Sequence, residues 1–243
     1  MDGDVIKVPA PGVSKVIDRL LASTIGQKAI MAVTGFALVG FVFVHMAGHL
    51  QMFQGPEAYN KYAHMLQGMG GIKWGLRGLL LVGVFAHMWA GVRLMMRNMS
   101  ARPDNYAVNK WLAASASAKT MRVTGPIVLF FIVYHMLHFT LLKVSSQGFE
   151  DMVYQLNGVG DVPDVYQRMV VSYQNPVLTA IYVLSVTLLG THLAHGIQSM
   201  FQTLGLNNNT YRPAVQVASR ALALIAVLGF VAVPLAILAG VIK

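Results

Sequence analysis

Five long apolar runs dominate the hydrophobic pattern of this chain. Each is roughly 20 residues or longer and almost free of charge, which is the length that an α-helix needs to cross the hydrocarbon core of a bilayer. The pattern therefore predicts an all-α integral membrane protein, with a segment 1–29 followed by a single transmembrane domain, 30–243. The expected spans are 30–53, 74–96, 123–142, 177–200 and 217–241.

The third connection between the spans, Lys143 to Asn175, is the longest. Within it, the run DVYQRMVVSY mixes apolar and polar positions, which suggests a short interfacial helix that caps the outer mouth of the bundle. An ordered loop explains the same run equally well. The first connection, which carries His64, is expected to be a loop.

Composition supports the membrane interpretation. The chain of 243 residues is 56% hydrophobic and only 11% charged, far below the roughly 25% of an ordinary soluble domain. It contains no cysteine, which excludes disulfides, thiolate-ligated haem, c-type haem attachment and iron–sulfur clusters held by this chain. Any haem iron must then be held by histidine or methionine.

The distribution of cations predicts the orientation. Cytoplasmic segments of membrane proteins carry an excess of Lys and Arg, so an N-in, C-out topology is expected. The formal charge of +9 reflects this flank, because no nucleic-acid-binding motif accompanies it. The cations that define the cytoplasmic side are Lys7, Lys15, Arg19, Lys28, Arg97, Arg102, Lys110, Lys119, Arg122, Arg212 and Arg220.

Histidines recur in four of the five spans. An imidazole at membrane depth is costly, so several of them together indicate a function, and metal ligation is the leading candidate. With a rise of about 1.5 Å per residue, His45 and His135 are expected roughly 22 and 18 Å from the cytoplasmic side. His87 and His195 are expected only about 14 and 8 Å from it.

Two pairs at two depths, each pair on different helices, fit two bis-histidine b haems stacked in a four-helix bundle formed by spans one to four. His138 and His192 lie one turn from His135 and His195 and fit the two levels about as well. One member of each neighbouring pair could therefore bind iron while the other forms a hydrogen bond nearby. Arg93 and Arg97 are candidate partners for the carboxylates of the inner haem.

Three segments carry a resemblance to a known family: VHMAGHLQMFQGPEAYNKYAH after span one, YHMLHFT in span three and THLAHGIQSMFQTLG at the end of span four. From about Gln27 onward, the sequence resembles the five-helix, di-haem cytochrome b membrane subunit of succinate:quinone oxidoreductases, the cytochrome b558 group related to fumarate reductase anchors. Residues matched to that family imply His45 and His135 as ligands of the outer haem. They imply His87 and His195 for the inner haem.

The resemblance also implies partners and a location. A flavoprotein subunit with FAD and an iron–sulfur subunit would bind at the cytoplasmic face, and the electrons would pass to or from a membrane quinone, expected to be menaquinone. The protein would lie in the bacterial cytoplasmic (inner) membrane. The sequence departs from relatives that use buried glutamates near the outer haem, because Leu193 occupies one such position and no span contains Asp or Glu.

Two other functions remain open from the sequence. The chain could be the cytochrome b subunit of a membrane hydrogenase or formate dehydrogenase, which also uses histidines on few helices. A haem-free transporter or proton channel with histidine relays belongs to another class.

Overall fold

The structure is a computed structural model that describes residues 13–101 and 116–243. The cations Lys7, Arg102 and Lys110, which were used to predict the orientation, lie outside the described residues. Five helices in the described part are long and apolar enough to cross a membrane, so the number of spans predicted from the sequence is confirmed. Their bounds, including adjoining short turns, are Thr24–Gln54, Gly70–Ser100, Ser117–Thr140, Pro176–Thr203 and Arg212–Leu238.

The spans correspond to five α-helices and are joined by shorter elements. Polar side chains at the N-termini explain several boundaries: Ser23 accepts a hydrogen bond from the Gly26 N–H, and Asn175 accepts from Val177 and Leu178. The described helices are α1 Val13–Ala22, α2 Thr24–Leu50, α3 Pro56–Gly68, α4 Gly70–Ser100, α5 Ala116–His135, α6 Val165–Gln174, α7 Pro176–Thr203 and α8 Arg212–Leu238.

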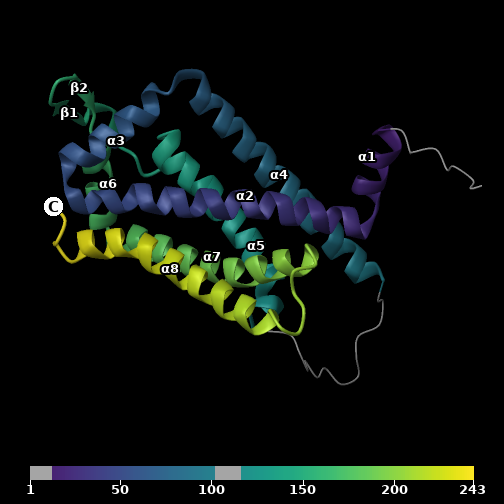
Figure 1. The fold of residues 1–243 in the computed structure, drawn as a ribbon. Coiled ribbons are helices and arrows are strands. Elements are labelled where there is room, and N and C mark those ends of the chain that lie inside the picture. The colour runs from purple at the N-terminus through teal and green to yellow at the C-terminus, as the bar shows by residue number, and fades with distance from the viewer. Residues whose placement is uncertain (1–12, 102–115) are drawn as a thin grey trace, which may run out of the picture.

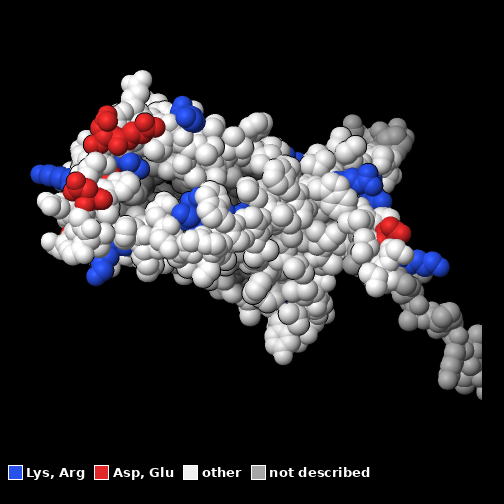
Figure 2. Space-filling model, turned by 90° about the horizontal axis from the view of Figure 1, so that it is seen from above, with Lys and Arg blue, Asp and Glu red and all other residues white. Residues whose placement is uncertain are grey.

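The first described helix and the C-terminus lie at opposite ends of the molecule, as an odd number of spans requires (Figure 1). Helix α1 lies at one end, and the C-terminus lies at the other beside α3 and α6 (Figure 1). Most of the acidic side chains gather at the end formed by α3, α6 and the strands, whereas the middle of the molecule is mostly uncharged (Figure 2). The two ends therefore differ in charge, as the sequence predicted.

The third connection contains the one departure from an all-α fold among the described residues. Strands β1 Val153–Leu156 and β2 Gly160–Pro163 pair antiparallel, with Leu156 opposite Gly160. The Asn157–Gly158 turn permits this hairpin because Gly158 adopts a φ of +76°. The all-α prediction is thus corrected by a small hairpin outside the spans. Of the two interpretations left open for the run after Pro163, the structure shows the short helix, α6.

The first connection is helical. Helix α3 begins at Pro56, a residue suited to the first helical position, and it contains His64, which the sequence analysis placed in a loop. Together, α3, α6 and the hairpin form a cap over the end of the spans that lies away from α1 (Figure 1). We call it the outer cap, because the sequence predicts that this end faces outward. Asn60 joins its parts, since its amide group donates to the Asp164 carboxylate and its oxygen accepts from the Tyr166 N–H.

Packing among the spans leaves a space between them. Helix α4 packs along α2, and α5 packs along α7, while α8 covers α7 and α2. Gly190 of α7 lies against Val227 of α8 with no room for a Cβ atom, a close approach of the kind that small residues allow in membranes. A large cavity is lined mainly by α2, α4, α5 and α7, and the four histidines predicted as haem ligands are among the residues that line it.

Candidate haem-binding cavity

One cavity of about 2120 Å³ runs between the spans. Its volume is about twice the upper end of the range of ordinary ligand pockets, about 300–1,000 Å³, so it has room for more than one large ligand. His45, His87, His135 and His195, the four ligands predicted from the sequence, all line it. His49 and His192 line it as well.

The outer part of the cavity brings together the first predicted pair. The imidazole ring centres of His45 on α2 and His135 on α5 are 5.8 Å apart. Two imidazoles on one iron need ring centres on the order of 6 Å apart, since each bond from a histidine nitrogen to a metal is about 2 Å. The structure therefore places the predicted outer pair at a separation compatible with a shared haem iron.

His49 is a third histidine at this level, and the sequence analysis gave it no role. Its Nε2 lies 3.3 Å from Nε2 of His45, and its Nδ1 lies 3.2 Å from the Tyr59 hydroxyl of the outer cap. Burial, and to a lesser degree Tyr62, raise the pKa of Tyr59, so the phenol stays protonated at neutral pH and can donate. His49 thus links the outer cap to the His45 ring.

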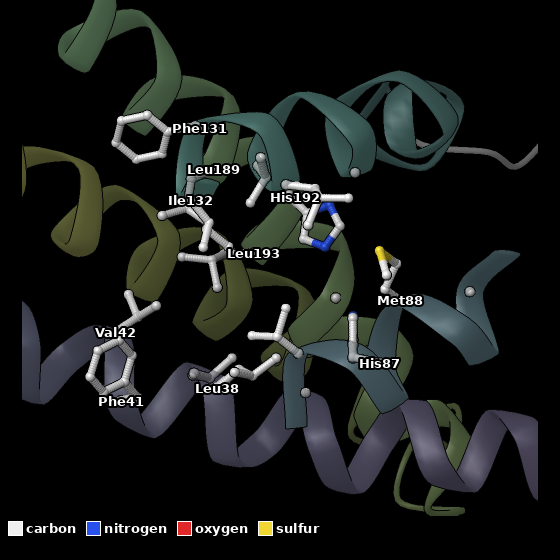
Figure 3. A pocket seen from close by; sticks show the side chains of 18 of the residues that line it. Leu38, Phe41, Val42, His87, Met88, Phe131, Ile132, Leu189, His192 and Leu193 are labelled. Carbon is white, nitrogen blue, oxygen red and sulfur yellow. The ribbon is translucent and has the colours of Figure 1, made fainter. Parts of the chain in front are cut away.

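The inner part of the cavity contains three histidines, His87, His192 and His195. The ring centres of His87 on α4 and His192 on α7 are 6.4 Å apart, whereas no ring contact between His87 and His195 occurs in the described part of the chain. Figure 3 shows the His87 and His192 side chains entering the cavity from different helices and pointing toward one another. His192, the alternative that the sequence left open, therefore faces His87.

Two glycines lie close to these rings. A Cβ atom at Gly35 would lie 3.3 Å from Cε1 of His87, and one at Gly125 would lie 3.8 Å from Cε1 of His192. At Gly35 a side chain would crowd the imidazole, whereas the distance at Gly125 is ordinary contact. Helix α2 can therefore approach His87 closely because residue 35 has no side chain.

The hydrogen bonds of His87 determine which of its nitrogens is free. Thr34 Oγ1 is 2.6 Å from the Ile30 carbonyl oxygen and 3.2 Å from His87 Nδ1. Because the threonine hydroxyl donates its only proton to the carbonyl, its oxygen accepts from an Nδ1–H of His87. The lone pair of the neutral imidazole then lies on Nε2, the form in which histidine binds a metal.

Two imidazole nitrogens in the cavity are buried and have no hydrogen-bond partner. They are Nδ1 of His135 in the outer part and Nδ1 of His192 in the inner part. An unpaired polar atom in apolar surroundings destabilises the fold. Each of the two unpaired nitrogens belongs to one histidine of a facing pair. The unpaired atoms and the facing rings are chemically suited to a metal that needs only two protein ligands.

His138 differs from the other histidines because both of its ring nitrogens are already bonded. It is fully buried, with Nδ1 at 2.9 Å from the Tyr182 hydroxyl and Nε2 at 3.2 Å from Ser172 Oγ. It lies in a π-helical turn, Met136–Thr140, that directly follows His135. His138 therefore ties the end of α5 to α6 and α7, and it has no nitrogen free for a metal.

The two arginines singled out by sequence lie elsewhere. Neither Arg93 nor Arg97 is among the residues that line the cavity, and Arg97 donates to the Ala22 carbonyl oxygen at 2.6 Å. The cavity wall instead contains Arg77, whose guanidinium lies 5.1 Å from the centre of the Trp74 ring. The sequence did contain a signal for Arg77, because it lies inside the second predicted span. A charged side chain inside a span is energetically costly and usually functional.

No group of three or more His, Cys, Asp or Glu side chains in the described ranges could hold a bare metal ion. A haem does not need such a group, because the porphyrin supplies the other ligands of the iron. The donor set is therefore suited to haem rather than to a free metal ion.

These features define a multi-pass membrane protein with paired histidines around an internal cavity. The chain belongs to the succinate dehydrogenase/fumarate reductase transmembrane subunit family, whose profile matches residues 97–232, more than half of the sequence. The match begins in the last turn of α4 and includes α5, α7 and most of α8. No curated protein and no solved structure matches the chain.

Family membership confirms the resemblance inferred from the sequence and identifies the chain as a membrane subunit of an oxidoreductase complex. The matched range contains His135 and His192 but not His45 or His87. The roles of the individual histidines therefore rest on the geometry of the cavity.

Proposed function

We propose that this chain is the cytochrome b membrane anchor of a succinate:quinone oxidoreductase. In this role it passes electrons between the iron–sulfur subunit and membrane quinone through two b haems. The observation that carries the proposal is the pairing of histidines from different helices at two levels of one cavity, 5.8 Å apart in one pair and 6.4 Å in the other. When bound, the two haems would supply one-electron carriers across the bilayer.

The ligand assignment follows the facing rings. His45 and His135 are the proposed outer ligands, as predicted from the sequence. For the inner haem we propose His87 with His192, because their rings face one another and His192 Nδ1 has no partner. His195, the inner ligand expected from the sequence, also lines the cavity, and its ligation stays a prediction that mutation can test.

Other residues orient and neutralise these groups. Thr34 fixes the tautomer of His87, so that Nε2 is available. His138 holds the turn after His135 through Tyr182 and Ser172. Arg77 supplies a positive charge in the cavity wall, and because no span contains Asp or Glu, a haem carboxylate is a suitable partner for it.

The remaining parts of the complex follow from the family. A flavoprotein subunit with FAD and an iron–sulfur subunit would bind at the end that contains α1, since the excess of cations predicts that this end is cytoplasmic. Dicarboxylate chemistry would occur on the flavin, because this chain has no dinucleotide-binding motif. The proposed location is the bacterial inner membrane, with menaquinone as the proposed quinone.

Two alternatives lose support. The cytochrome b subunit of a hydrogenase or formate dehydrogenase does not agree with the family that matches residues 97–232. A haem-free transporter does not agree with that family either, because the family is the membrane subunit of an oxidoreductase complex.

The test is a reduced-minus-oxidised spectrum of the purified complex, with pyridine-haemochrome quantification per copy of this chain. We expect two low-spin b haems, one for each histidine pair. One haem per chain in a fully loaded preparation would contradict the two-level assignment. A complete absence of haem would contradict the cytochrome function itself, and identification of the co-purifying subunits separates the oxidoreductase complexes from one another.

A further inference from the structure

Helix α1 presents an uncovered apolar stripe. Val13, Ile17 and Leu21 are spaced four residues apart, so they lie on one face of the helix, and their exposed fractions are 77%, 48% and 44%. Lys15 and Asp18 occupy other positions of the same helix, and both are exposed. A short amphipathic helix of this kind needs a partner for its apolar face.

The orientation of α1 is fixed by side chains of two spans. Gln27 of α2, which is fully buried, donates to the Leu21 carbonyl oxygen at 2.8 Å, and Arg97 of α4 donates to that of Ala22. Both carbonyls belong to the last turn of α1, where a helix has no partners of its own for them. Figure 1 shows α1 lying across the direction of α2, with a sharp bend between them.

The position of α1 places it at the membrane boundary. Its last residue, Ala22, is followed after Ser23 by Thr24, the first residue of a membrane-spanning helix. A helix that crosses the direction of that span at this point lies close to the plane of the bilayer surface. Lys15 and Lys28 are exposed on either side of the bend, a charge that complements an anionic leaflet.

We propose that α1 is an interfacial helix that binds the surface of an anionic lipid leaflet. Val13, Ile17 and Leu21 insert between the acyl chains, while Lys15 and Lys28 lie among the phosphate headgroups. The helix thereby holds the cytoplasmic ends of α2 and α4 at the level of the headgroups through Gln27 and Arg97. This proposal depends on the membrane-spanning helices alone and not on the haems.

The chain has no cysteine, so single cysteines can carry a nitroxide spin label without further changes. We suggest Ile17→Cys on the apolar stripe, Asp18→Cys as the adjacent control and Val33→Cys, exposed on α2, as a reference within the membrane. The whole complex is placed in vesicles of phosphatidylcholine, with or without phosphatidylglycerol. Collision rates with oxygen, which enters lipid, and with a water-soluble nickel chelate are then measured.

We expect the label at residue 17 to resemble that at residue 33, with high collision rates for oxygen and low rates for the chelate, and the label at residue 18 to show the reverse. Adding phosphatidylglycerol should move the label at residue 17 deeper into the bilayer, which lowers its collision rate with the chelate. A label at residue 17 that collides freely with the chelate would overturn the proposal. The proposal would also be overturned if the label were shielded from both reagents in the complex but exposed to the chelate in the isolated chain. In that case a protein partner, and not lipid, would cover the apolar stripe.

Discussion

The Thr34 hydroxyl and the His87 imidazole form a hydrogen bond of 3.2 Å that joins α2 to α4 at the edge of the cavity. Since the hydroxyl donates to the Ile30 carbonyl oxygen, the bond from His87 must come from Nδ1–H. This contact links a span that carries a proposed outer ligand, His45, to the span that carries a proposed inner ligand. It also provides a test of the inner site that leaves every ligand in place.

Replacing Thr34 with valine keeps the shape of the side chain and removes the acceptor of His87 Nδ1–H. We expect the inner haem to be bound about 10-fold to 100-fold more weakly, as is typical when the hydrogen-bond partner of a ligating histidine is lost. The potential of the inner haem should rise, because a less basic imidazole stabilises ferric iron less. Redox titration of the two haems measures both effects. Thr34→Ser retains the hydroxyl and should behave like the wild type; an equal effect in both variants would assign the change to packing.

Replacing His192 with alanine should remove the inner haem and leave the outer one. The matched variant His195→Ala should keep both haems, because no ring contact joins His87 to His195 in the described part of the chain. Haem content per chain and low-temperature spectra distinguish the two sites. Loss of the inner haem only in His195→Ala would return the ligand role to the residue predicted from the sequence.

The spans and an approximate depth for each histidine could be predicted from the sequence because both depend on local rules. Twenty apolar residues define a span regardless of its neighbours, and a rise per residue gives an approximate depth. The choice between His192 and His195 could not be made in this way, since the two lie three residues apart and helix tilt and rotation decide which faces α4. Those quantities arise from packing such as that of Gly190 against Val227.

The sequence also contains local signals for the hairpin, for the start of α3 and for Arg77. The Asn157–Gly158 pair between short runs of strand-forming residues is a typical hairpin signal, and Pro56 after Gly55 marks the start of α3. Arg77 lies inside the second predicted span, where a charge needs an explanation. The relation of His49 to Tyr59, in contrast, arises from the fold of the outer cap and could not be read from local sequence.

Arg77 offers a second test of the cavity. Arg77→Gln removes a positive charge from its wall, and we expect a haem potential to fall, because a nearby cation stabilises the reduced state. Lys73→Gln is the matched control: Lys73 Nζ lies 5.6 Å from the same Trp74 ring, but Lys73 does not line the cavity. Redox titration should show little change for Lys73→Gln. Equal shifts in both variants would indicate a general surface effect instead of a partner for a haem carboxylate.

Asn60 should be essential to the stability of the outer cap. Its side chain is buried and bonds Asp164 and the Tyr166 N–H, at 3.0 and 3.1 Å. Asn60→Ala leaves the buried Tyr166 N–H unpaired. We therefore expect the free energy needed to open the outer cap to fall by about 1–3 kcal/mol. Hydrogen exchange at the Tyr166 amide reports this loss, and the exposed neighbour Lys61 provides the control variant Lys61→Ala. Unchanged protection of Tyr166 in Asn60→Ala would show that other contacts hold the cap.

The orientation in the membrane can be tested with single cysteines at two exposed connections. Asn209 lies between α7 and α8, and Asp161 lies in the hairpin at the other end of the molecule (Figure 1). With the N-terminus in the cytoplasm, five spans place Asn209 inside and Asp161 outside. An impermeant maleimide applied to intact cells without their outer membrane should therefore label Asp161→Cys only. The same reagent on inverted vesicles should label Asn209→Cys, and more slowly when the soluble subunits are bound. The reverse pattern would invert the topology and move the docking face to the other end, whereas labelling of both positions from one side would contradict the odd number of spans.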